Sequence, residues 1–93
     1  MTERQWQQQV VELARIMGWL VYHTFDSRRS EPGFPDLVLT KNGRLIFAEL
    51  KTEKGRVSPE QEEWLGTLDL VPCAEAHTWR PSDFPAVEAA LKG

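Results

Sequence analysis

Three charged residues interrupt an otherwise apolar segment, GFPDLVLTKNGRLIFAELK. They are Asp36, Glu49 and Lys51, and a buried sheet would normally exclude all three. Asn42-Gly43 divides the segment, and Asn-Gly between two apolar runs is the strongest short-range signal for a β-hairpin. If these two residues form the centre of a type I′ turn, Asp36 lies directly opposite Glu49 on one face of the hairpin.

Two carboxylates in opposite positions destabilise a strand pair unless something lies between them, because their Cβ atoms are only about 5 Å apart. Burial worsens the repulsion. A hard divalent cation resolves it, since Mg²⁺ takes oxygen ligands and is commonly held by one or two carboxylates. Lys51 follows Glu49 by two residues and therefore shares its face. The pattern predicts a Mg²⁺ site that hydrolyses a phosphodiester bond.

Each charged residue has a simpler interpretation when taken alone. An isolated Asp or a Glu-x-Lys sequence is more typical of a solvated strand, or of an ion pair within the protein. The combination on one face of an apolar hairpin favours the catalytic interpretation instead.

The sequence predicts seven elements that position these residues. Two capping boxes, Thr2 with Gln5 and Ser58 with Gln61, indicate helix starts, and Gly18 suits a helix end. The expected order is helix 2–18, strand 19–25, strands 34–40 and 44–51, helix 58–71, strand 74–80 and helix 81–93. This α-β-β-β-α-β-α order predicts an α/β (α+β) fold, a mixed four-stranded sheet flanked by helices, in which the crossover helix joins parallel strands in a right-handed connection.

The composition is typical of one small globular domain spanning residues 1–93. Apolar residues make up 41% of the chain, which contains four Trp, and we expect most of these Trp side chains to lie in the core. No apolar run reaches the length of a membrane span, and the polar start excludes a signal peptide. The single cysteine, Cys73, excludes an internal disulfide. We therefore expect an intracellular protein with no membrane partner.

The charge distribution favours a polyanionic partner despite the net charge of −3. Residues 28–56 carry most of the Lys and Arg, whereas the rest of the chain is acidic. A local basic segment matters more for binding a polyanion than the total charge does.

Several motifs in this order resemble a known nuclease family. Pro35-Asp36 followed by Glu49-Leu50-Lys51 resembles the PD-(D/E)xK nuclease signature. The fuller pattern resembles the virus-type replication-repair nuclease family, VRR-NUC. It comprises a Gln-rich first helix ending in Gly18-Trp19, then Gly33-Phe34-Pro35-Asp36, Phe47-Ala48-Glu49-Leu50-Lys51 and Ser58-Pro59-Glu60-Gln61 leading to Trp64-Leu65.

This resemblance implies a restriction-endonuclease-like αβββαβ core and Mg²⁺- or Mn²⁺-dependent cleavage of DNA, often branched or flapped. It implies that Asp36, Glu49 and the backbone carbonyl of Leu50 bind the metal. Lys51 would orient the water or stabilise the transition state.

The resemblance also implies a further carboxylate, because many members add a Glu from the first helix. Counting back from the Gly-Trp that ends that helix places this position at Gln7, whose neutral amide is a weaker ligand. Glu3 and Glu12 could substitute, although neither falls at that position.

Basic residues near the hairpin are candidates for phosphate contacts, with a solvated loop as the alternative. They are Arg28 and Arg29 before Asp36, and Lys54 and Arg56 after Lys51. Gln61 is a candidate DNA or active-site contact, or serves only in its capping box. His23 and His77 lack metal-ligand spacing, so we expect structural roles for both.

The leading hypothesis is a metal-dependent, structure-selective DNA endonuclease acting in replication, repair or recombination. One alternative is a Holliday-junction-resolving nuclease acting as a homodimer. Another is a catalytically weak DNA-binding module of the same fold, motivated by Gln7. We expect a homodimer because closed two-fold assemblies are the commonest. The expected location is the cytoplasm of a bacterial or phage-infected cell.

Overall fold

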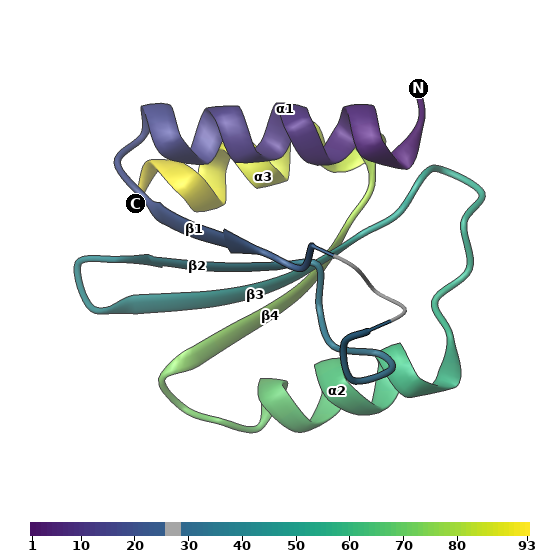
Figure 1. Ribbon diagram of the computed structural model, residues 1–93. Coiled ribbons are helices and arrows are strands. Elements are labelled where there is room, and N and C mark those ends of the chain that lie inside the picture. The colour runs from purple at the N-terminus through teal and green to yellow at the C-terminus, as the bar shows by residue number, and fades with distance from the viewer. Residues whose placement is uncertain (26–28) are drawn as a thin grey trace.

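Helices cover both faces of a four-stranded mixed sheet (Figure 1). The computed structural model describes residues 1–25 and 29–93. Helices α1 and α3 lie on one face, and α2 lies on the other. The elements are α1 (Glu3–Ile16), β1 (Leu20–His23), β2 (Leu37–Lys41), β3 (Arg44–Leu50), α2 (Pro59–Asp69), β4 (Ala74–Trp79), a 3₁₀ turn (Pro81–Asp83) and α3 (Phe84–Lys92). The predicted order and fold class are confirmed.

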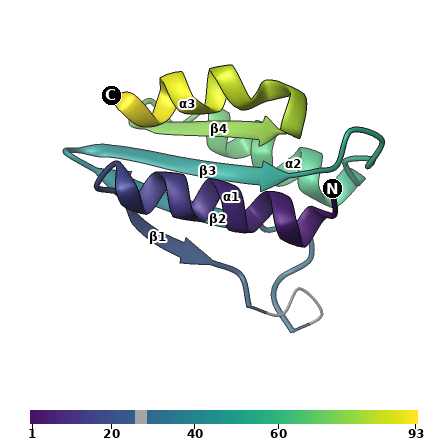
Figure 2. The same ribbon diagram turned by 90° about the horizontal axis from the view of Figure 1, so that it is seen from above.

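The strands run in the order β1-β2-β3-β4. The pairs β1–β2 and β2–β3 are antiparallel, whereas β3 and β4 are parallel. Figure 2 shows β1 at one edge of the sheet, seen from above the α1 face. Helix α2 connects β3 to β4, so the prediction that the crossover helix joins parallel strands is confirmed.

The hairpin has the predicted register. Lys41 pairs with Arg44, and Leu37 pairs with Ala48 at the far end of the ladder. Between the strands, Asn42 has φ 48° and Gly43 has φ 81°, the positive values that a type I′ turn requires at both central residues. The next positions beyond the last pair are Asp36 and Glu49, which end the hairpin side by side.

The apolar core fixes which face carries the charges. Five strand residues are completely buried in one cluster with Trp6, Val10, Val87 and Leu91 of the two helices above: Leu37, Leu39, Ile46, Ala48 and Leu50. Because side chains alternate along a strand, the intervening residues point to the α2 face. Glu49, between Ala48 and Leu50, is therefore directed away from this core.

Both predicted capping boxes are present, at Thr2 with Gln5 and at Ser58 with Gln61. Three of the four Trp side chains are buried in the core as expected, and Trp64 is half-buried. No side chain of α2 is fully buried, so this helix lies on the sheet more loosely than α1.

Several element boundaries differ from the predicted ones. Strand β2 spans Leu37–Lys41 rather than residues 34–40, so Asp36 lies just before the strand and not within it. Strand β1 is shorter than residues 19–25, because the amide of Trp19 still donates to Ala14 O at the end of α1. Helix α2 ends at Asp69 rather than at residue 71. The last helix begins with a 3₁₀ turn, in which the carboxylate of Asp83 accepts from the amide of Arg80. Within residues 1–25 and 29–93, no helix is long and apolar enough to cross a membrane.

Candidate functional site

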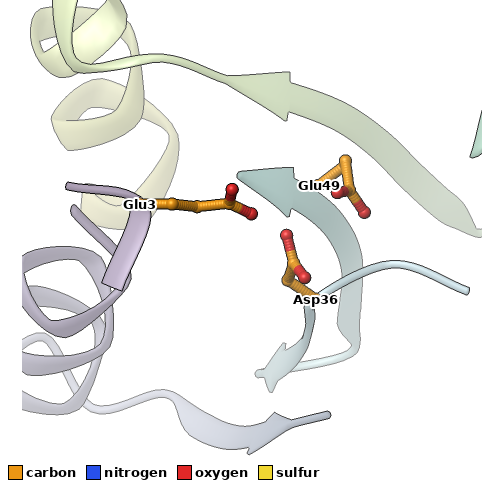
Figure 3. A group of neighbouring side chains, drawn as sticks. All are labelled: Glu3, Asp36 and Glu49. Atoms are coloured by element: carbon orange, nitrogen blue, oxygen red, sulfur yellow. The ribbon is translucent and has the colours of Figure 1, made fainter. Parts of the chain in front are cut away.

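Three carboxylates from separate elements meet at one end of the sheet (Figure 3). Glu3 comes from the first turn of α1, Asp36 lies immediately before β2, and Glu49 lies near the end of β3. Each offers an oxygen within 4.8 Å of the others. Asp36 is held by the amide of Leu50, which donates to its Oδ2 at 2.8 Å. The two carboxylates that the sequence placed opposite each other are thus close together, although the paired ladder ends at Leu37 and Ala48, and a third carboxylate lies beside them.

Glu49 is the most deeply buried carboxylate of this cluster, and its charged form is the least favourable. Its residue is only 1% exposed, and burial raises the pKa of its carboxyl to about 8, with the charge of Asp36 adding to the shift and that of Lys51 opposing it. The pKa of Glu3 is also raised, first by partial loss of water around its carboxylate and then by Asp36. A cation placed among these oxygens would offset both the loss of water and the repulsion between the carboxylates, and would therefore lower both pKa values.

Two partners approach one oxygen of Glu49 and leave the other unused. Gln61 Nε2 donates to Oε2 at 2.9 Å, and Lys51 Nζ lies 3.7 Å from the same atom. Glu49 Oε1 is buried and finds no hydrogen-bond partner among the residues that the structure describes. A buried polar atom without a partner is costly, so the donor set fits a hard metal ion that accepts only oxygen ligands.

Gln61 has both of the functions that the sequence left open. Its Oε1 accepts from the amide of Ser58 at 2.8 Å and completes the capping box. Its Nε2 meanwhile holds Glu49. One side chain therefore links the start of α2 to the acidic cluster.

The carboxylate from α1 belongs to Glu3, one turn before the position that the sequence indicated. Gln7 is half-buried and lines a pocket together with Glu3 and Asp36. Glu3 and Gln7 are four residues apart and share a helix face. That spacing could have identified Glu3 from the sequence, because a glutamate one turn from Gln7 points to the same side. A catalytic role for Gln7 stays a prediction, as does metal binding by the carbonyl of Leu50.

Trp6 holds the first turn of α1 against the sheet. Its indole Nε1 donates to the backbone oxygen of Trp79 at 2.9 Å, and the amide of Lys51 donates to the same oxygen at 3.1 Å. The 1% exposed Trp6 side chain thereby places Glu3 at a fixed distance from the end of β3.

The segment that leads into Asp36 is packed against α2. Gly33 has φ +88°, and a Cβ there would lie 2.5 Å from the backbone carbonyl of Glu60. Phe34 stacks edge-on against Trp64 at 5.2 Å between ring centroids, and Trp64 Nε1 donates to Pro32 O at 3.2 Å. Only glycine fits at position 33, because both the backbone conformation and the close approach exclude a side chain.

The loop after Lys51 is held by Arg80, a residue that the sequence did not indicate. Arg80 Nη1 donates to the carbonyls of Thr52 at 2.6 Å and Gly55 at 2.7 Å. The loop carries Lys54 and Arg56, which are both exposed. Phosphate contacts by these two residues stay a prediction.

Other candidates have less defined surroundings. Arg29 is exposed, and Arg28 lies outside the described residues. His77 stacks on Trp79 at 5.2 Å and lies 3.6 Å from Glu75, in keeping with the structural role expected for it.

Comparison with known proteins identifies the family. Residues 2–77 match the family described as the VRR-NUC domain. The chain belongs to the VRR-NUC family. A solved structure entitled "VRR_NUC domain" has the same fold, with a TM-score of 0.73 and 21% sequence identity over 97% of this chain and 94% of that chain. The family match and this structural similarity confirm the resemblance to VRR-NUC proteins that the sequence indicated.

A second solved structure has a named activity. It is Hjc of Archaeoglobus fulgidus, a Holliday junction resolvase from an archaeal hyperthermophile, with 25% identity and a TM-score of 0.58. The similarity covers 84% of this VRR-NUC chain and 67% of Hjc. A search of curated proteins found no match.

Proposed function

We propose that this VRR-NUC chain is a metal-dependent DNA endonuclease that selects its substrate by structure. The observation that carries the proposal is the meeting of Glu3, Asp36 and Glu49 beside Lys51. One buried oxygen of Glu49 has no hydrogen-bond partner within residues 1–25 and 29–93. Three carboxylates and an ammonium group at one point suit phosphoryl transfer better than a structural role, because one ammonium group carries too little charge to balance three carboxylates.

The metal proposed is Mg²⁺ or Mn²⁺, since all the available ligands are oxygen atoms. Asp36 and Glu49 would hold it, with Glu3 and the carbonyl of Leu50 as further ligands. When bound, such an ion supplies Lewis-acid charge at the phosphoryl group.

The side chains have separable tasks in this proposal. The amide of Leu50 orients Asp36, and Gln61 holds Oε2 of Glu49, which leaves its Oε1 for the metal ion. The ammonium of Lys51 lies where negative charge develops in the transition state, or where it orients the attacking water. Gln7 would contact the same site from α1.

The positions of the exposed cations support a DNA substrate. We propose that Lys54 and Arg56 contact phosphates on one side of the cluster and that Arg29 contacts a phosphate from the loop that precedes Asp36. Arg28 is proposed as a further contact on the sequence alone, because it lies outside the described residues. Such contacts position the duplex without reading its sequence. Neutralising Lys54 and Arg56 together should flatten the slope of log K against log salt by about 1.8, the value for two contacts with B-DNA.

Incubation with labelled flap, fork, nicked and four-way-junction DNA tests the activity directly. We expect cleavage in Mg²⁺ or Mn²⁺ and none with chelator. Binding without cleavage under every metal condition would instead identify a DNA-binding module of the same fold.

The likeness to Hjc supports a second, narrower proposal. A homodimer would present two metal sites to a two-fold substrate such as a four-way junction. Light scattering should then give about twice the 10.7 kDa chain mass, and the junction should be nicked at symmetric positions. A fully active, strictly monomeric species would contradict both the dimer and junction resolution.

A further inference from the structure

A groove runs along α1 away from the acidic cluster. It consists of two adjoining pockets that share Arg4, Gln7 and His23. The first pocket, of about 540 Å³, reaches Glu3 and Asp36. The second, of about 310 Å³, continues to Gln8, Val11 and Arg15. We call these two pockets the α1 groove.

One stripe of α1 forms the floor of this groove. Arg4, Gln8, Val11 and Arg15 follow one another at intervals of three or four residues, so they share one helix face. This stripe borders the core face, which carries Trp6, Val10 and Ala14, and Val11 belongs to both. At about 1.5 Å per residue, the two arginines lie roughly 16 Å apart along the helix.

The groove changes character along its length. The end at Asp36 carries the carboxylates that suit a metal ion, whereas the pocket that reaches Arg15 has two arginines and no carboxylate among its described lining residues. A strand whose reacting phosphate sits at a metal ion needs this order, since its other phosphates require cations and hydrogen-bond donors.

An exposed aromatic side chain lies at the carboxylate end of the groove. Phe25 lines the pocket that contains Glu3 and Asp36, yet 92% of its surface is exposed. Such exposure within residues 1–25 and 29–93 is unusual, because phenylalanine is among the most often buried residues. A nucleobase that is not paired can stack on such a ring, whereas a paired base within a duplex keeps its faces covered.

We propose that the α1 groove binds an unpaired nucleic-acid strand that continues from the scissile phosphate. Arg4 and Arg15 contact its phosphates, and Phe25 stacks on a base next to the site of cleavage. This proposal rests on the proposed function and adds a specificity determinant to it, because only substrates with an unpaired arm can occupy the groove.

Arg15→Gln tests the phosphate contact, and Lys92→Gln is its matched control. Each substitution removes one exposed positive charge from the last turn of a helix, α1 and α3 respectively. Binding of a fluorescein-labelled oligothymidylate is followed by anisotropy in chelator, over a series of salt concentrations. We expect Arg15→Gln to lower the slope of log K against log salt by about 0.7, the value for one single-strand phosphate contact, and Lys92→Gln to leave it unchanged.

Phe25→Ala tests the stacking contact, and Tyr22→Ala is its control. Tyr22 is 62% exposed in β1. It pairs with Val38, which lies between the core residues Leu37 and Leu39, so Tyr22 is on the α2 face of the sheet and does not line the α1 groove. Phe25→Ala should weaken binding of the oligonucleotide about fivefold or more, and should have no effect on binding of an abasic oligonucleotide. Tyr22→Ala should bind both as the wild type does.

Equal salt slopes for Arg15→Gln and Lys92→Gln would overturn the phosphate path, and so would a loss confined to blunt duplex DNA. An equal effect of Phe25→Ala on abasic and ordinary strands would overturn the stacking contact. These measurements need no metal, so they are independent of cleavage. If the wild type cuts DNA but these tests fail, the proposed nuclease activity stands and the proposal for the α1 groove is wrong. If the tests succeed but the wild type does not cut DNA, only the proposed nuclease activity is wrong.

Discussion

Replacing Glu49 by Gln should stabilise the metal-free protein, and by an amount that depends on pH. Glu49 is buried and its pKa is raised from 4.5 to about 8. The folded state therefore holds a proton on this carboxyl over a range in which the unfolded state has lost it. By linkage, the free energy of unfolding of the wild type falls as pH rises from about 4.5 to about 8. Glutamine keeps the shape of the side chain and removes the charge.

The size of the effect follows from the shift in pKa. Each unit corresponds to about 1.4 kcal/mol, so the full shift corresponds to about 5 kcal/mol. Water that enters beside the half-buried Asp36 relieves part of the cost of the buried charge. We therefore expect Glu49→Gln to match the wild type near pH 5 and to exceed it by about 2 to 5 kcal/mol at pH 9. For a domain of this size that is at least about 10 °C in Tm.

Urea unfolding followed by tryptophan fluorescence, in chelator at several pH values from 5 to 9, measures this difference. Glu12→Gln is the control, because it removes one acidic charge from an exposed position on α1, where substitutions change stability by about 0.5 kcal/mol or less. Adding Mg²⁺ at pH 9 should stabilise the wild type by occupying its site and should leave Glu49→Gln almost unchanged. The same variant should lose cleavage.

A constant difference between wild type and Glu49→Gln across this pH range would refute the reasoning, since it would separate the stability change from ionisation of the carboxyl. A wild type that is the more stable protein at pH 9 without metal would refute it more directly. Retained cleavage by Glu49→Gln above a few per cent would show that the carboxylate is not a necessary ligand.

Three further predictions concern the other residues of the site. Lys51→Ala should lower the single-turnover cleavage rate by about 10²- to 10³-fold with little change in Kd for DNA, whereas equal losses in both would make it an ordinary phosphate contact. Glu3→Gln should weaken activation by Mg²⁺ more than Gln7→Ala does. The opposite order would show that Gln7, the position indicated by the sequence, is the more important contact from α1. Gly33→Ala should lower the stability by about 1–3 kcal/mol more than Gly43→Ala in thermal unfolding, because both glycines have positive φ but only Gly33 lies against the backbone of α2. Equal losses would show that the approach to α2 is not tight.

The hairpin could be predicted in detail because a local signal fixed its register. Asn42-Gly43 sets the turn, and the alternation of apolar residues sets the faces. From these two facts the juxtaposition of Asp36 and Glu49 followed without any tertiary information. The helix starts were equally predictable, since a capping box involves residues only three apart.

The contacts that bring distant segments together could not be predicted in the same way. The count that placed the helix position at Gln7 used the end of α1, whereas the tilt of α1 is set by Trp6 and its bond to Trp79 O, 73 residues away. Arg80 likewise reaches the loop after Lys51 from beyond β4. No periodicity in the sequence reports such partners, because they depend on packing between elements.

The apolar face of the hairpin, which packs on α1 and α3, holds the strand register that brings Asp36 and Glu49 together. Moving β3 by one residue would exchange Glu49 with Ala48 or Leu50 and place a carboxylate in the core. Each large apolar side chain buried there contributes about 1.5–3 kcal/mol. Leu37, Leu39 and Ile46 together therefore contribute about 4.5–9 kcal/mol, which is comparable to or larger than the cost of about 5 kcal/mol for ionising Glu49. The metal-free domain can therefore fold with its carboxylates already converged, and the strain that they carry is the free energy that a bound cation would release.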